Sequence, residues 1–251
     1  MSALLEVSGI SKHFGGLHAV RDVSFSIAPA EIVGILGPNG AGKTTLYNLL
    51  TGFIPPDSGS VLFKGRELRG MAPYRIAGLG ISRTFQLCRP FVGMTVFENV
   101  IVGGLGHGSG GAALSARAHA LLEQVGLAGK ERLQVEALSY GDQRRLEIAR
   151  ALAAKPALLL LDEPFAGLGS GEIADLSGLI RSVHAEEGLT VMLIEHKLRE
   201  FMRLVGRVIA LDFGEIIAEG SPEDIVRHPA VIEAYIGRGD EQQAQEHASV
   251  A

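Results

Sequence analysis

Short apolar runs, separated by polar and glycine-containing turns, recur along the chain. Leu158–Leu161 contains no polar residue, which is typical of a parallel strand buried on both faces of a sheet. The pattern also predicts strands at Ile32–Leu36, Thr190–Ile194, Val208–Leu211 and Glu215–Ala218. These runs predict a core sheet whose strands come from both halves of the chain.

The N-terminal part of the chain predicts a second sheet. Its expected strands are Leu4–Ile10, Val20–Ile27 and Ser60–Phe63, and turns rich in Gly and Pro separate them. Short connections of this kind favour antiparallel pairing. We therefore expect an α/β fold with a mixed core sheet, helices and an antiparallel N-terminal β-subdomain.

From about Leu87 to Lys155 the apolar positions follow a helical period. They include Leu114, Ala118, Leu121, Leu122 and Val125. The glycine-rich stretch Gly103–Gly111 interrupts the pattern, and we expect a flexible linker there, with a functional loop as the alternative. The region as a whole predicts a helical subdomain.

The C-terminal part predicts one more helix and a tail. Ser221 is a good N-cap and Pro222 suits the first helical position. Val231–Gly237 is amphipathic and is expected to dock on the body, and from Arg238 onward the polar residues predict a frayed tail. The expected organisation is a core of residues 1–86 and 156–220, a helical subdomain of residues 87–155, and a C-terminal helix and tail over residues 221–251.

Composition narrows the class of protein. The chain has 251 residues, of which 47% are hydrophobic and 20% charged, so it is expected to be globular and without a membrane span. The N-terminus lacks the basic flank and cleavage site of a leader. A net charge of −5 argues against general nucleic-acid binding. The single cysteine, Cys88, excludes an internal disulfide.

A glycine-rich run follows the strand at Ile32–Leu36 and fits the phosphate-loop pattern G-x-x-x-x-G-K-[ST]. Its backbone N–H groups and the following helix N-terminus would bind phosphate, Lys43 would reach the β- and γ-phosphates, and the Thr44 hydroxyl would bind Mg²⁺. The alternative is a strand-to-helix turn that binds nothing. The expected ATP-binding residues here are Gly37, Pro38, Asn39, Gly40, Ala41, Gly42, Lys43, Thr44 and Thr45.

Two carboxylates, Asp162 and Glu163, end the buried run Leu158–Leu161. Ligands of open α/β sheets bind beyond the carboxyl ends of the strands, so both should lie beside the phosphates. Asp162 then suits Mg²⁺, which prefers oxygen ligands, and Glu163 is the candidate base for the attacking water. Alone, this run would be an ordinary polar turn. With the phosphate loop, it predicts hydrolysis of a nucleoside triphosphate.

A third run, Leu138–Arg145, has the sequence Leu-Ser-Tyr-Gly-Asp-Gln-Arg-Arg and precedes a helical pattern. It resembles the signature sequence of ATP-binding cassette (ABC) ATPases. The usual family residues are Gly at the position of Tyr140 and Gln at that of Asp142, whereas Ser139 and Gly141 match. The resemblance implies that these two residues bind ATP across an interface with a second ATPase subunit.

Further residues match the family in order along the chain. The resemblance implies that Phe14 stacks on adenine, that Gln86 senses Mg²⁺ and the γ-phosphate, and that His196 contacts the γ-phosphate. Each has an ordinary alternative, such as a core Phe or a polar strand cap. Gly169 lies where the family has Asp or Asn. The implied catalytic set is Lys43, Gln86, Glu163 and His196, and the implied metal ligands are Thr44, Gln86 and Asp162.

The runs Gly80–Gln86, Met94–Val100 and Glu195–Lys197, with the closing Ala-Tyr-Ile-Gly, are similar to LivG-type ATPases of bacterial importers for branched-chain amino acids. The same group serves amides, urea and some aromatic acids. The resemblance implies a peripheral subunit on the cytoplasmic face of the inner membrane. Its implied partners are integral-membrane permeases, a second related ATPase and, indirectly, an extracytoplasmic solute-binding protein. The apolar residues after Gln86 are expected to form part of a groove for a permease helix, and the alternative is that they pack within the helical lobe; they are Leu87, Pro90, Phe91 and Val92.

Two other classes of function are weighed against transport. A soluble ABC ATPase of DNA repair or ribosome work would carry coiled-coil insertions, tandem cassettes or basic arms, which the sequence lacks. A nucleotide-binding regulator without turnover would not need Glu163 and His196. The sequence therefore favours a transport ATPase.

Overall fold

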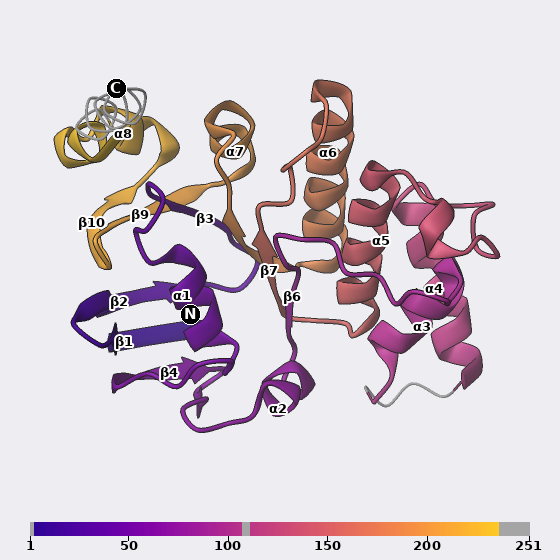
Figure 1. The fold of residues 1–251 in the computed structure, drawn as a ribbon, viewed down its shortest axis with the longest axis horizontal. Helices are drawn as coiled ribbons and strands as arrows, with labels where there is room; N and C mark the ends of the chain where they lie inside the picture. Colours follow the sequence, from indigo (N-terminus) through magenta and orange to yellow (C-terminus); the bar gives the residue numbers. More distant parts are fainter. Residues whose placement is uncertain (1–2, 107–110, 236–251) are drawn as a thin grey trace, which may run out of the picture.

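The computed structural model describes residues 3–106 and 111–235, which form a mixed sheet, an antiparallel sheet and a group of helices at one end (Figure 1). The mixed sheet has the strand order β10-β9-β3-β8-β7-β6, in which β10 is antiparallel to β9 and the other pairs are parallel. Its strands, in that order, are Glu215–Gly220, Arg207–Asp212, Ile32–Leu36, Thr190–Ile194, Leu158–Asp162 and Ile81–Arg83. The mixed core sheet predicted from the apolar runs is confirmed.

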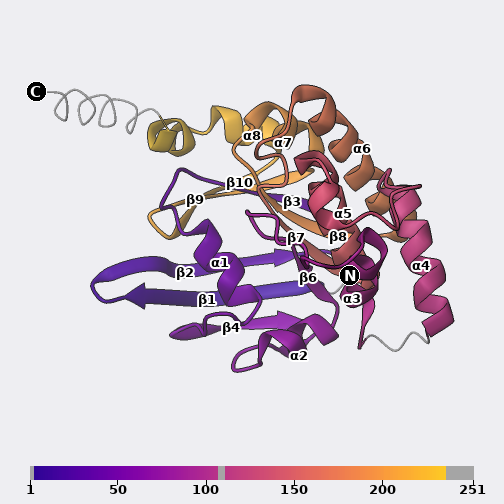
Figure 2. The same cartoon turned by 45° about the vertical axis from the view of Figure 1, so that its right-hand side comes forward.

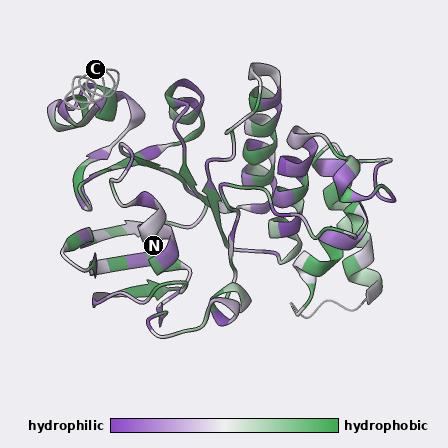
Figure 3. Ribbon diagram, in the orientation of Figure 1, coloured by the Kyte–Doolittle hydropathy of each residue, from purple (hydrophilic) through white to green (hydrophobic). Residues whose placement is uncertain are grey.

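The central strands are apolar throughout because both faces of the sheet are covered. In β7, Leu159 and Leu161 join one core while Leu158 and Leu160 join the other. Successive side chains of a strand point to opposite faces, so each strand feeds two cores. The hydrophobic colouring of the sheet centre follows from this arrangement (Figure 3).

The antiparallel sheet lies below the mixed sheet in Figure 1 and has the order β2-β1-β4-β5. Its strands, in that order, are Leu17–Ile27, Leu5–Phe14, Ser58–Phe63 and Arg66–Glu67. Buried residues of helix α1 (Lys43–Leu50) share one core with this sheet and with one face of the mixed sheet. The predicted antiparallel sheet is confirmed, although β1 and β2 are longer than their apolar patterns indicated.

The second core joins the other face of the mixed sheet to the helices on its far side. In α4, the predicted positions Leu114, Ala118, Leu121 and Leu122 are all buried. Helices α3 to α5 pack together at one end of the molecule (Figures 1 and 2). The helices are α2 (Pro73–Gly78), α3 (Val96–Gly104), α4 (Gly111–Gln124), α5 (Tyr140–Ala153), α6 (Ser170–Glu187), α7 (Leu198–Leu204) and α8 (Pro222–Arg227), with a 3₁₀ turn at Val135–Ala137.

The prediction of a flexible linker over Gly103–Gly111 is wrong at both of its ends. Gly103 and Gly104 belong to α3, and Gly111 begins α4. A Cβ at Gly103 would collide with the backbone carbonyl of Arg150, so glycine lets α3 approach α5 closely. The glycine therefore serves packing at this position. Residues 107–110 lie outside the described part of the chain.

At the C-terminal side, the predicted cap is confirmed. The Ser221 hydroxyl accepts a hydrogen bond from the Asp224 N–H (3.2 Å), and Pro222 occupies the first turn of α8. Val231 is buried and Tyr235 packs against the same core, as the amphipathic pattern predicted. The tail expected from Arg238 lies outside the described residues. Within the described ranges, no helix is both long and apolar enough to cross a bilayer.

Candidate active site

The candidate site lies where four adjacent parallel strands end. In the sheet order β3-β8-β7-β6, the chain continues from these strands into Gly37, Glu195, Glu163 and Thr84 respectively. The carboxyl ends of parallel strands share one edge of the sheet. Segments far apart in the sequence are therefore brought together there.

The phosphate loop joins β3 to α1. Gly42 has φ of 99°, and a Cβ there would collide with the carbonyl oxygen of Ala19, so the loop requires glycine. Lys43 is buried, and its Nζ donates to the carbonyl oxygens of Gly37 (2.6 Å) and Pro38 (2.9 Å). The lysine thus already lies along the loop into which a polyphosphate would fit.

Glu163 contacts two of the other residues predicted to act in hydrolysis, Gln86 and His196. Its Oε2 accepts a hydrogen bond from Gln86 Nε2 (2.9 Å), and its Oε1 lies 3.0 Å from His196 Nε2. Glu163 has φ of 49°, a left-handed conformation that is uncommon outside glycine and concentrates at functional sites. The structure therefore brings together three predicted residues from the segments that follow β6, β7 and β8.

Asp162, one residue earlier, has a partner that the sequence did not predict. Arg83 Nη2 donates to Asp162 Oδ2 (2.8 Å), and both side chains are almost fully buried. The same guanidinium donates to Asn48 Oδ1 (2.6 Å) and lies 5.0 Å from the ring centre of Phe85. The residues Arg83 and Asp162 are 79 positions apart, so their pairing shows only in the parallel pairing of β6 and β7.

The sequence also missed the role of Glu195. This buried carboxylate accepts hydrogen bonds from three backbone N–H groups: Phe165 (2.6 Å), His196 (2.8 Å) and Lys197 (3.1 Å). It thereby holds the loop that carries His196 against the loop after Glu163. Its position directly before His196 was the one available signal.

The residues that could hold Mg²⁺ are Thr44, Gln86 and Asp162. All three offer oxygen ligands, which this cation prefers. Among the described residues there is no group of three or more His, Cys, Asp and Glu side chains that could form a metal cage. A single carboxylate with neutral oxygens suits a magnesium ion that reaches the protein with nucleotide phosphates and water, so the residues fit the ion. Bound there, Mg²⁺ would neutralise phosphate charge.

Ser139, Gly141 and Phe14 belong to other elements than the residues of this cluster. Ser139 is the N-cap of α5, and its hydroxyl accepts a hydrogen bond from the Asp142 N–H (3.2 Å). In both views α5 stands apart from α1 and the phosphate loop (Figures 1 and 2). Phe14, about half exposed, ends β1 in the other sheet. The placement of Ser139 and Gly141 away from Lys43 is what a site shared between two subunits requires.

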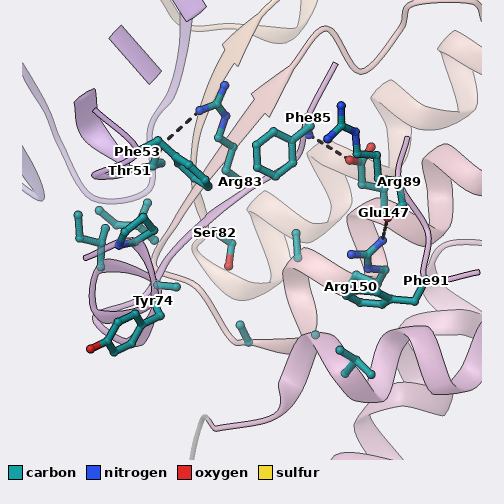
Figure 4. Close-up of a pocket in the computed structure, with 18 residues that line it drawn as sticks. Thr51, Phe53, Tyr74, Ser82, Arg83, Phe85, Arg89, Phe91, Glu147 and Arg150 are labelled. Atoms are coloured by element: carbon teal, nitrogen blue, oxygen red, sulfur yellow. Dashed lines mark hydrogen bonds between the residues drawn. The ribbon is translucent and has the colours of Figure 1, made fainter. Parts of the chain in front are cut away.

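A cavity of about 640 Å³ opens beside β6, between the core and the helices (Figure 4). Phe91 lines it, whereas the neighbouring Leu87, Pro90 and Val92 do not. Both aromatic rings and charged side chains line its wall: Phe53, Tyr74, Arg83, Phe85, Arg89, Phe91, Glu147 and Arg150. Its volume lies within the range of about 300–1,000 Å³ that is typical of binding pockets.

Comparisons with known proteins agree with this geometry. Residues 20–166 match the family model described as ABC transporter, and residues 215–241 match the one described as branched-chain amino acid ATP-binding cassette transporter. The chain is 42% identical over 250 residues to the high-affinity branched-chain amino acid transport ATP-binding protein LivG of Escherichia coli K12, covering 93% of this chain and 98% of LivG. It is 40% identical over the same length to BraF of Pseudomonas aeruginosa, with the same coverage.

Solved structures show the same fold. The ADP conformation of an ATP-binding cassette of an ABC transporter superposes with a TM-score of 0.86 at 31% identity, covering 94% of this chain and all of that one. A nucleotide-free ATP-binding cassette gives a TM-score of 0.85 at 31% identity, covering 94% of this chain and 99% of the other. The fold predicted from the sequence is confirmed by these likenesses.

Proposed function

The chain belongs to the ABC transporter family of ATP-binding proteins, and from this premise we propose that it energises solute import as one ATPase subunit of a membrane complex. It binds nucleotide and hydrolyses ATP, as its family does. The proposed cargo is a branched-chain amino acid or a related small polar solute, such as an amide, urea or an aromatic acid. Full-length similarity to LivG and BraF supports this choice. A soluble ATPase of DNA repair or ribosome work is not favoured.

The observation that carries the proposal is the convergence of Gln86, Glu163 and His196 beside the phosphate loop. We propose that Lys43 and the loop amides bind the β- and γ-phosphates and that Thr44, Gln86 and Asp162 hold Mg²⁺. Glu163 acts as the base for the attacking water, and its hydrogen bonds to Gln86 and His196 orient it. Phe14 is the proposed adenine contact.

A second ATPase subunit completes the proposed site. Ser139 and Gly141 would bind the nucleotide held by the partner, and the partner's equivalent residues would bind the nucleotide held here. The partner is proposed to be a related ATPase or a second copy of this chain. ATP closes the pair and hydrolysis reopens it.

The cavity beside β6 is the proposed contact with a permease. Its wall combines exposed aromatic rings with Arg89 and Arg150, and Arg150 lies 4.4 Å from the ring centre of Phe91. Apolar pockets with charged edges suit an amphipathic helix. The complex would then hold this chain at the cytoplasmic face of the inner membrane, with a solute-binding protein acting from the other side.

The sandwich is tested with Glu163→Gln, which keeps the shape of the side chain and removes the base. Phosphate release by the assembled complex should fall about 10²- to 10⁴-fold, because general-base catalysis contributes that much. Light scattering should show dimers with ATP and monomers with ADP. The control Glu163→Gln with Ser139→Arg places a bulky cation at the interface and should stay monomeric. Wild-type turnover in Glu163→Gln would remove the base assignment.

The permease contact is tested with Phe91→Asp. Because Phe91 is already partly exposed, the variant should fold and bind ATP, but it should not co-purify with its permeases. Leu105→Asp is the matched control, since Leu105 is also exposed in the helical region and does not line the cavity. Equal co-purification of both variants would place the contact elsewhere.

A further inference from the structure

Helix α5, which begins after the predicted residue Ser139, carries two buried charged residues, Arg144 and Glu147. Arg144 is 2% exposed and Glu147 is 9% exposed. They form an ion pair through Arg144 Nη1 and Glu147 Oε2 (3.2 Å). Burying charge is costly unless further hydrogen bonds satisfy the remaining polar atoms of the pair.

The pair holds the backbone of the segment that carries Gln86. Arg144 Nη1 donates to the carbonyl oxygen of Phe85 (3.0 Å), and Arg144 Nη2 donates to that of Gln86. In the other direction, the Phe85 N–H donates to Glu147 Oε1 (3.0 Å), as Figure 4 shows. The peptide groups on both sides of Phe85 are therefore tied to one helix.

Two neighbours fix the pair itself. The Tyr140 hydroxyl accepts a hydrogen bond from Arg144 Nη2 (2.9 Å), and the Cys88 thiol lies 3.6 Å from Glu147 Oε2. Burial raises the pKa of Glu147, although the Phe85 N–H and the Arg144 guanidinium act in the opposite direction. Tyr140, one of the two residues that depart from the usual signature, thus has a partner on the same helix.

The consequence concerns the Gln86 side chain. Gln86 is exposed, so packing does not fix its amide, whereas its backbone is held by Arg144. That amide reaches Glu163 at 2.9 Å. A small displacement of the backbone would break this contact, and displacements of about 1 Å can cost about 10²-fold in rate.

We propose that Arg144 and Glu147 are positioning residues for ATP hydrolysis. They tie the Gln86 backbone to the helix that begins at Ser139, so that the Gln86 amide is held at Glu163 and any movement of α5 is passed to it. The inference rests on the role proposed above for Gln86.

The test uses the assembled complex and measures kcat and KM for ATP. Arg144→Met should lower kcat about 10-fold or more with KM changed less than about 3-fold, because the phosphate loop is untouched. Gln86→Ala should lower kcat as well. The double variant Arg144→Met with Gln86→Ala should have a kcat within about 2-fold of that of the slower single variant. The reason is that two substitutions that act through one residue do not multiply their effects.

Conservative variants separate positioning from folding. Glu147→Gln keeps an oxygen that can accept the Phe85 N–H, so it should lose less activity than Glu147→Leu. Arg144→Lys keeps the charge beside Glu147 but lacks the planar fork that spans two carbonyl groups, so it should share the kcat loss even if Arg144→Met does not fold.

Arg117→Met is the matched control. Arg117 lies in α4, and its Nη2 donates to the carbonyl oxygen of Leu152 in α5 (2.8 Å). Its replacement should therefore lower the free energy of unfolding and leave kcat unchanged. Unchanged kcat in the Arg144 variants, or losses that multiply in the double variant, would overturn the positioning role alone. Wild-type kcat in Gln86→Ala would overturn both this inference and the role proposed for Gln86.

Discussion

Replacing Arg83 by Met should destabilise the protein strongly. The side chain of Arg83 is 5% exposed and that of its partner Asp162 is 4% exposed, with 2.8 Å between Arg83 Nη2 and Asp162 Oδ2. Met preserves most of the apolar stem but removes the guanidinium, whose Cζ lies 5.4 Å from the ring centre of Tyr47 and 5.0 Å from that of Phe85. It leaves the carboxylate of Asp162 buried without its cation, and Asn48 without a donor.

The magnitude follows from that uncompensated charge. Removing one partner of a buried ion pair costs about 3–5 kcal/mol in the free energy of unfolding. For a protein of this size, about 1 kcal/mol shifts the Tm by roughly 2–4 °C. The expected fall in Tm is therefore roughly 6–20 °C.

Thermal unfolding of the purified chain without nucleotide measures this shift. Arg21→Met is the matched control, because Arg21 pairs with Glu215 at the surface, where the side chains are 57% and 44% exposed. Exposed pairs contribute about 0–1 kcal/mol, so the control should lose at most about 4 °C. Equal shifts in the two variants would refute the argument that burial makes the Arg83 pair important.

Three further outcomes are expected. Lys43→Ala should weaken ATP binding about 10- to 100-fold by calorimetry, since a charge-assisted contact contributes about 1.5–3 kcal/mol; unchanged affinity in a folded variant would contradict the phosphate-loop assignment. Gly103→Ala should lower the free energy of unfolding, measured with denaturant, by about 1–3 kcal/mol because its Cβ meets α5. Gly78→Ala is the control, since the space around its Cβ is open, and it should be neutral or stabilising. Equal effects of the two substitutions would contradict the packing argument. Burial and the charge of Glu147 raise the pKa of Cys88 to about 12, so at pH 8 its alkylation should be about 10³-fold slower than that of free cysteine. The alkylation rate should rise with pH and in the Glu147→Gln variant. A rate equal to that of free cysteine would contradict the raised pKa.

The sequence alone determined those elements that depend on neighbouring residues in the chain. Leu158–Leu161 could be recognised as a strand because both of its faces are buried, so every position is apolar. The start of α8 could be recognised because a cap and a proline act on their own turn. The glycines and lysine of the phosphate loop are contiguous for the same reason: they act together through one stretch of backbone.

The ends of strands were harder to predict from the sequence where their side chains are not buried and therefore need not be apolar. Ser11–Phe14 extend β1 beyond the predicted Ile10, although they include polar residues. They pair with β2 through backbone hydrogen bonds at the end of the strand, where their side chains are partly or fully exposed, so the side chains need not be apolar.

Only the tertiary structure decided the contacts that hold the candidate site. The sheet order places β8 between β3 and β7, which brings His196 to Glu163, and no local pattern specifies that order. Arg83 meets Asp162 across 79 positions, and Arg144 meets Phe85 across 59. From the sequence alone a charged residue is expected to be exposed, because a charged side chain is rarely buried unless it is paired with an opposite charge. The sequence could therefore locate the groups proposed to act on ATP, while the arginines that contact them became visible only when distant segments met in the fold.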